Sequence, residues 1–169
     1  MIFSDSRKFG SVLWGEGTDV NCHHLIKKLG LEPFDQLFNA QYLYLNTQKR
    51  KIPVKVLLMD GKIVAGIGNI YASEILFHCN INPMRSSKDL SLMECTNICD
   101  ASQHILKKSI QLGGTTIKNF RTLKNKKGLF SQALQVYGRA GKNCKNCTAI
   151  ILKIIQNNRS SFYCPNCQT

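Results

Sequence analysis

Four cysteines near the end of the chain are the residues whose spacing specifies a chemistry most clearly. Two residues separate Cys144 from Cys147 and Cys164 from Cys167, and sixteen residues lie between the two pairs. A two-residue spacing lets a tight turn aim both thiolates at one point, and sixteen residues are enough for a hairpin that brings the second turn opposite the first. Four converging thiolates make the closed tetrahedral shell of a structural zinc, with no position open for catalysis. We therefore predict one structural Zn²⁺ ion; disulfides and a redox Cys-x-x-Cys are the weaker alternatives.

A second segment of the chain has the residue types of a phosphate site. Gly66-Ile67-Gly68 precedes Asn69, where a helix is expected to begin, and the exposed amides of a helix start attract phosphate. A tight turn between packed helices also explains these glycines. A dinucleotide-binding fingerprint is disfavoured because its third glycine is missing. Arg159 lies between the cysteine pairs where the hairpin should turn, and from the residues alone a solvated surface arginine explains it as well as a functional one does.

The distribution of charge favours a polyanionic partner. The chain has 169 residues and a net charge of +13. Residues 1–100 hold eleven Lys/Arg against all ten Asp/Glu, whereas residues 101–169 hold twelve Lys/Arg and no acidic residue. A folded surface of one sign repels itself unless a polyanion binds it, so nucleic acid is the expected partner. An anionic membrane is a weaker alternative, because no basic amphipathic helix dominates and no apolar run approaches the ~20 residues that span a bilayer. The start of the chain lacks the pattern of a secretory signal, and we expect a cytoplasmic, nucleoid-associated protein.

The elements that must position these residues are mostly helical. A capping box at Ser91-Leu92-Met93-Glu94 predicts the start of a long helix that Gly113-Gly114 ends. Residues 1–17 read as a strand cut from a larger sheet, and Leu134 to Tyr137 are strand-like. The other four cysteines, at positions 22, 79, 95 and 99, are expected to be small core residues. Apolar spacing and stop signals predict four more helices, over residues 19–30, 39–51, 53–59 and 69–79.

The order of these pieces resembles the formamidopyrimidine-DNA glycosylase family. The resemblance covers nearly the whole chain, and it rests on Asp5–Gly10, Leu58–Asp60, Gly66–Glu74, Gly113–Thr116, Leu134–Arg139 and Arg159–Cys164. It implies a mainly α fold: a helix-two-turn-helix DNA-binding domain followed by a small β-hairpin zinc finger with four cysteines. We expect a remnant of the amino-terminal β-sandwich domain over residues 1–17, the helical domain over 18–131 and the finger over 132–169.

The resemblance also implies roles for single residues. Asn69 would bind a phosphate at its helix start, assisted by Lys55 and Arg50. Arg7 and Phe9 would fill the gap in the duplex and contact the widowed base when the lesion is flipped out. Arg159 would hold the phosphates that flank the lesion and donate a proton in the final elimination. The loop from Lys118 to Gln132 would cover an oxidised purine.

One part of the family's catalytic equipment is missing from this sequence. The family's nucleophile is an amino-terminal proline followed by glutamate, with a lysine later in the same β-sandwich, and nothing before Asp5 supplies them. We therefore expect the carboxy-terminal part of a bifunctional DNA glycosylase/AP lyase for oxidised purines (8-oxoguanine, formamidopyrimidines), inactive in base excision by itself. Its expected partner is double-stranded DNA with oxidised bases or abasic sites, bound by a monomer.

Two other functions are compatible with parts of the sequence. The chain could be a zinc-dependent module that only grips DNA, or one half of a split enzyme completed by a separate amino-terminal half. A zinc ribbon of the transcription or translation machinery would explain the cysteines and the charge, but not Arg7-Lys8-Phe9 or the helix start at Asn69.

Overall fold

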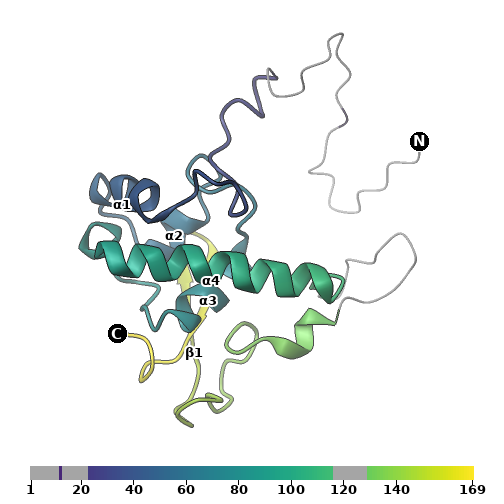
Figure 1. Ribbon diagram of the computed structural model, residues 1–169. Coiled ribbons are helices and arrows are strands. Elements are labelled where there is room, and N and C mark those ends of the chain that lie inside the picture. The colour runs from purple at the N-terminus through teal and green to yellow at the C-terminus, as the bar shows by residue number, and fades with distance from the viewer. Residues whose placement is uncertain (1–11, 13–22, 116–128) are drawn as a thin grey trace.

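The longest helix, α4 (Leu92–Gln111), organises the helical part of the molecule (Figure 1). Its start is the predicted capping box: the Ser91 hydroxyl accepts a hydrogen bond from the Glu94 amide, and the Glu94 carboxylate accepts one from the Ser91 amide. Its end is set by Gly113 and Gly114, whose φ angles of 74° and 83° are left-handed. The computed structural model describes residue 12, residues 23–115 and residues 129–169.

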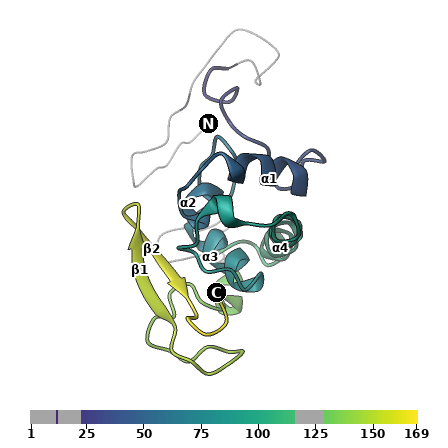
Figure 2. The same cartoon turned by 90° about the vertical axis from the view of Figure 1, so that its left-hand side faces the viewer.

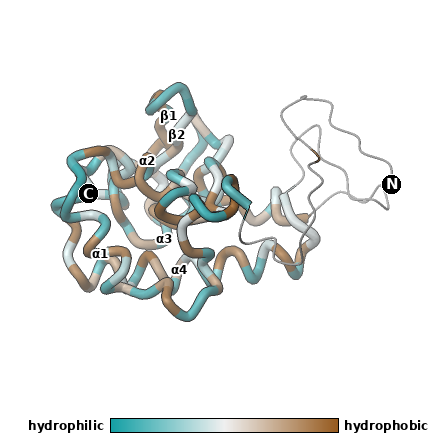
Figure 3. The backbone as a smooth tube through the Cα atoms, turned by 90° about the horizontal axis from the view of Figure 1, so that it is seen from above, coloured by the Kyte–Doolittle hydropathy of each residue, from teal (hydrophilic) through white to brown (hydrophobic). Residues whose placement is uncertain are grey.

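Three shorter helices pack with α4 around one apolar cluster. They are α1 (Ala40–Gln48), α2 (Val54–Leu58) and α3 (Asn69–His78). Apolar and polar residues alternate along α4 in Figure 3, and its buried face carries Cys95, Ile98 and Ile105. These side chains meet Leu43, Leu57 and Ile75 of the other three helices. Two 3₁₀ turns, η2 (Ser87–Asp89) and η3 (Phe130–Ala133), complete the helical elements of the described residues.

A two-stranded antiparallel hairpin lies on the other side of α3 (Figure 2). Strand β1 (Leu152–Gln156) pairs with β2 (Arg159–Tyr163), and Gln156 opposes Arg159 beside the turn. Asn157 and Asn158 form that turn with φ angles of 47° and 59°, which asparagine tolerates better than most residues. A second apolar cluster, which includes Phe77, Val136, Ile151 and Phe162, joins the hairpin to α3. Helix α3 thus lies between α4 and the hairpin, which confirms the predicted hairpin after a helical domain.

Two sequence predictions about local structure were wrong. Residues 23–30 form turns rather than the end of a helix, and Leu25, Ile26 and Leu29 are exposed, so this segment lacks the buried face that would stabilise a helix. Leu134–Tyr137 form no strand. Their amides are instead occupied by a side chain: the buried Glu74 carboxylate of α3 accepts hydrogen bonds from Gln135, Val136 and Tyr137 at 2.8, 3.0 and 2.8 Å.

The predicted strand of residues 1–17 and most of the predicted loop of residues 118–132 lie outside the described residues. Among the cysteines that the finger does not use, Cys95 and Cys99 are buried in the core as predicted, and Cys79 is half-buried. Burial raises the pKa of the Cys79 and Cys99 thiols to about 12 and that of Cys95 to about 11, so all three are poor nucleophiles at neutral pH. Within the described part of the chain, no helix has both the length and the apolar character to cross a lipid bilayer.

Candidate zinc site and phosphate-binding pocket

The four predicted cysteine ligands converge at the base of the hairpin. The sulfur atoms of Cys144, Cys147, Cys164 and Cys167 all lie within 4.8 Å of one another. The Sγ–Sγ distance is 3.9 Å between Cys144 and Cys167 and 3.4 Å between Cys147 and Cys164. Tetrahedral zinc with Zn–S bonds of about 2.3 Å requires sulfurs about 3.8 Å apart. The cluster therefore has the dimensions of a four-thiolate zinc shell.

The knuckles are held by the backbone and by one buried glutamine. The Cys144 amide donates to the Ala149 carbonyl at 2.7 Å, and the Gln168 amide donates to the Cys164 carbonyl at 3.1 Å. The Gln168 side chain is 1% exposed; its Oε1 accepts from the Cys164 amide and its Nε2 donates to the Ile81 carbonyl. The second knuckle is thereby fastened to the turn that follows α3.

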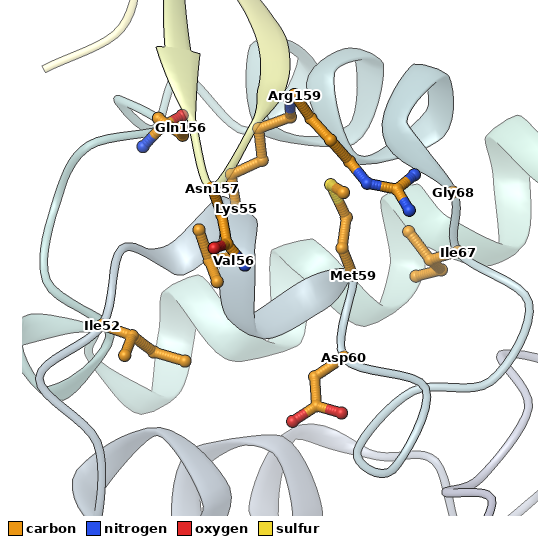
Figure 4. A pocket seen from close by; sticks show the side chains of 10 residues that line it. All are labelled: Ile52, Lys55, Val56, Met59, Asp60, Ile67, Gly68, Gln156, Asn157 and Arg159. Carbon is orange, nitrogen blue, oxygen red and sulfur yellow. The ribbon is translucent and has the colours of Figure 1, made fainter.

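A pocket of about 320 Å³ opens where the tip of the hairpin meets the start of α3 (Figure 4). Lys55 comes from α2, Gly68 from the start of α3, and Arg159 from the first position of β2. The Arg159 side chain is exposed, and Figure 4 shows its guanidinium reaching past Met59 toward Ile67 and Gly68. Residues distant in the sequence thus place two cationic groups beside one helix start.

The start of α3 differs from the starts of the other two long helices. Asn39 caps α1 and Ser91 caps α4 with side-chain oxygens, whereas the N-cap of α3 is Gly68, which supplies no side chain. A Cβ at Gly68 would meet no atom within 4 Å, so this side of the pocket is open. Gly66 precedes it with a φ of 90°, a conformation that favours glycine. The uncapped amides and the helix dipole favour an external anion here.

Lys55 is the buried cation of this pocket. Its side chain is 1% exposed, and its Nζ donates to Asn69 Oδ1 at 2.6 Å, Ser161 Oγ at 2.7 Å and the Ser160 carbonyl at 3.0 Å. Burial, and secondly the positive charge of Arg159, lower the pKa of Lys55 to about 8. Asp60 is the carboxylate among the lining residues, but it forms no ion pair within 4.0 Å in the described part of the chain.

Of the residues predicted to bind DNA, the structure thus brings together Lys55, Asn69 and Arg159. Arg50 lies beyond the end of α1, where its Nη1 donates to the Asn46 carbonyl at 2.8 Å, and it does not line the pocket. Arg7 and Phe9 lie outside the described residues. Sequence reasoning missed Ser161, which β-strand alternation places on the same face as Arg159, and Tyr137, whose hydroxyl accepts from Asn69 Nδ2 at 3.3 Å.

Comparison with known proteins identifies both parts of the chain. Residues 29–121 match the family model described as the formamidopyrimidine-DNA glycosylase H2TH domain. The chain belongs to the formamidopyrimidine-DNA glycosylase family. Residues 141–169 match the model described as the zinc finger found in FPG and IleRS. With the geometry of the four sulfurs, this match establishes Cys144, Cys147, Cys164 and Cys167 as a structural zinc site.

Individual relatives within the family match almost all of this chain. The formamidopyrimidine-DNA glycosylase of Rickettsia africae (strain ESF-5) is 44% identical over 168 residues, which are 99% of this chain and 61% of the relative. That of Herminiimonas arsenicoxydans is 43% identical over 167 residues, 98% of this chain and 61% of the relative. The chain therefore spans about three-fifths of the length of these glycosylases.

Solved structures of the family show the same fold. The MutM (FPG) protein from Thermus thermophilus superposes with a TM-score of 0.81 at 32% identity, over 85% of this chain and 55% of that one. A Lactococcus lactis FPG mutant in complex with Fapy-dG containing DNA gives a TM-score of 0.79 at 34% identity, over 86% of this chain and 53% of that one. The L. lactis Fpg complex with abasic-site DNA gives 0.78 at 34% identity, with the same coverage.

Proposed function

We propose that this chain binds damaged duplex DNA and forms the DNA-gripping part of a bifunctional glycosylase/AP lyase for oxidised purines. The pocket carries the proposal: a buried ammonium, an exposed guanidinium and an uncapped helix start face one opening. Each of the three favours a phosphate group. The relatives whose structures contain Fapy-dG or abasic-site DNA support the choice of damaged DNA as ligand.

We propose that Asn69 and Arg159 contact the phosphates beside the lesion and that Arg50 assists from outside the pocket. The uncompensated charge of residues 101–169 adds a general electrostatic attraction for the DNA backbone. Arg7 and Phe9 are proposed to occupy the space that the extruded nucleotide leaves, since an apolar wedge separates the stacked bases and a guanidinium satisfies the freed base edges. Arg159 is also the proposed proton donor in the elimination.

The domain division that this function uses is residues 1–17, 18–131 and 132–169, the last being the zinc finger. The zinc supports the fold of the finger and does no chemistry, because its four cysteines leave no position for water or substrate.

We propose that the bound chain is a monomer and acts in the cytoplasm on the nucleoid. A zinc ribbon of the translation machinery is less well supported, since the helical match distinguishes this chain from one that shares the finger alone.

Base excision also needs a nucleophilic amine at the sugar C1′, and the proline that supplies it in the family is absent from residues 1–169. We propose that a polypeptide of these residues binds the lesion without excising the base, as a DNA-binding module or as half of an enzyme completed by a separate catalytic half.

The binding proposal is tested with two duplexes of one sequence, one undamaged and one with a stable abasic-site analogue. Both are titrated with the 169-residue chain, loaded with zinc, at fixed salt. We expect binding to the abasic duplex to be about tenfold or more tighter, because a site without a base is easier to extrude and bend. Equal affinity for both would leave a general DNA-binding protein and would contradict damage recognition.

A further inference from the structure

Lys55 lies at the junction of three segments that are distant in the sequence. Its Nζ reaches Asn69 on α3 and two residues of β2, Ser160 and Ser161, at distances from 2.6 to 3.0 Å. The side chain is 1% exposed. An ammonium has three N–H donors, and all three have acceptors within the protein. Lys55 therefore has no free donor for a phosphate in this arrangement.

The contacts of Lys55 set the positions of the Asn69 side chain and of the start of β2. Its bond to Asn69 Oδ1 turns the side-chain amide so that Nδ2 faces the Tyr137 hydroxyl at 3.3 Å. Its bonds to Ser160 and Ser161 hold the start of β2, and Arg159 is the residue immediately before them. One buried side chain thus fixes the hairpin tip relative to the start of α3.

We propose that Lys55 is a positioning residue that holds Arg159 and Asn69 at one pocket and acts on DNA through them rather than by direct contact with a phosphate. This inference rests on the proposed DNA-binding function. It changes the role of Lys55 from one phosphate ligand among several to the fastening between the helical domain and the finger.

The positioning role of Lys55 can be distinguished by experiment from the effect of its positive charge. Arg159 on β2 is the charged group that acts on it, and Asp60, the other charged residue that lines the pocket, is not paired with it. When the amine loses its proton it keeps two donors and gains a lone pair, into which the Ser161 hydroxyl can donate. All three contacts then survive, so high pH removes the charge and leaves the fastening. Substitution by methionine removes both.

A double-mutant cycle tests the proposal on the zinc-loaded chain with abasic-analogue DNA. We expect Lys55→Met and Arg159→Ala each to weaken binding about tenfold to hundredfold, the range of lost charged hydrogen bonds. If Lys55 acts through Arg159 and Asn69, adding Lys55→Met to an Arg159→Ala, Asn69→Ala background should weaken binding by less than about threefold. Lys28→Met, at an exposed position before α1 and outside the basic stretch of residues 101–169, removes the same charge and is expected to change affinity by less than about threefold.

Additive losses in this cycle would overturn the proposal, because they would mean that Lys55 contacts DNA independently of its neighbours. Ser161→Ala provides a milder test if Lys55→Met does not fold, since it removes one acceptor of the ammonium. We expect a several-fold loss of affinity that disappears in the Arg159→Ala background; a loss that persists there would count against the proposal. Failure of the unaltered chain to bind any duplex would instead refute the proposed function.

Discussion

At the scale of single residues, the site depends on two buried charged side chains that form several hydrogen bonds each. Lys55 and Glu74 are 1% and 4% exposed, yet both are charged groups with several hydrogen-bond partners. The Glu74 carboxylate accepts a hydrogen bond from the backbone amide of Tyr137. Lys55 donates to Asn69 Oδ1, and Asn69 Nδ2 donates to the Tyr137 hydroxyl. Both buried side chains are thus linked to Tyr137, one directly and one through Asn69. A buried charge with satisfied partners costs stability to lose, and here it fixes the position of neighbouring groups.

The lowered pKa of Lys55 predicts that DNA affinity depends on pH. A phosphate brought into the pocket should raise this pKa from about 8. The charge therefore contributes its full affinity below about pH 8, and this contribution is lost as the pH rises from there through the pKa of the complex. The total loss should be no more than about threefold, because the ammonium does not touch the phosphate. Titrations from about pH 7 to about pH 9.5 at constant salt should show this loss for the unaltered chain and a flatter profile for Lys55→Met. Parallel profiles would show that another group is responsible.

At the scale of elements, local signals determined the parts that the sequence predicted well. The capping box at Ser91 and the Gly113-Gly114 stop bound α4 as expected, because both act within a few residues. The four cysteines and the hairpin between them followed from spacing alone. The contacts of Lys55 join it to residues 14, 105 and 106 positions away, and those of Glu74 span 61 to 63. No sequence pattern encodes pairings at such separations. The sequence could therefore not predict that Lys55 is buried, or that the amides of residues 135–137 bind Glu74 instead of forming a strand.

The finger is expected to carry one zinc per chain. Protein purified without added metal should contain close to one equivalent by elemental analysis, and Cys167→Ala should lose most of it, because three thiolates and a water hold zinc more weakly than four. Cys79→Ala removes a half-buried thiol outside the cluster and should keep its zinc. An equal loss in both variants, or zinc-free protein with a folded finger, would contradict the assignment.

At the scale of the whole molecule, the finger is an integral part of the helical domain. Lys55 fastens the hairpin tip, Glu74 the segment before the finger and Gln168 the last knuckle. All three fastenings end on α2, α3 or the turn after α3. Loss of zinc should therefore disturb the phosphate pocket as well as the finger. The ligand Cys164 directly follows β2, the strand that carries Arg159 and Ser161.

Also at the scale of the whole molecule, the amines of residues 1–169 determine whether this polypeptide can excise a base by itself. Lysines have reference pKa values of about 10.4 and are protonated at neutral pH. Lys55, with a pKa of about 8, is also mostly protonated at neutral pH, and it is buried with its nitrogen occupied. Borohydride trapping with a polypeptide of residues 1–169 should give no adduct on 8-oxoguanine DNA and at most a faint one on abasic DNA, where the aldehyde is already free. A strong adduct on the oxidised base would show that one of these residues is a competent nucleophile.

The central claim is that the pocket between Arg159 and the start of α3 binds a DNA phosphate, and the salt dependence of binding tests it most directly. The dissociation constant for an abasic-analogue duplex would be measured for the unaltered chain and for Arg159→Ala across a series of salt concentrations. We predict a steep linear loss of log affinity with log salt, and a slope shallower by about one in the variant, since each phosphate neutralised releases about 0.9 counterion. A flat dependence, or identical slopes for the two proteins, would contradict the account.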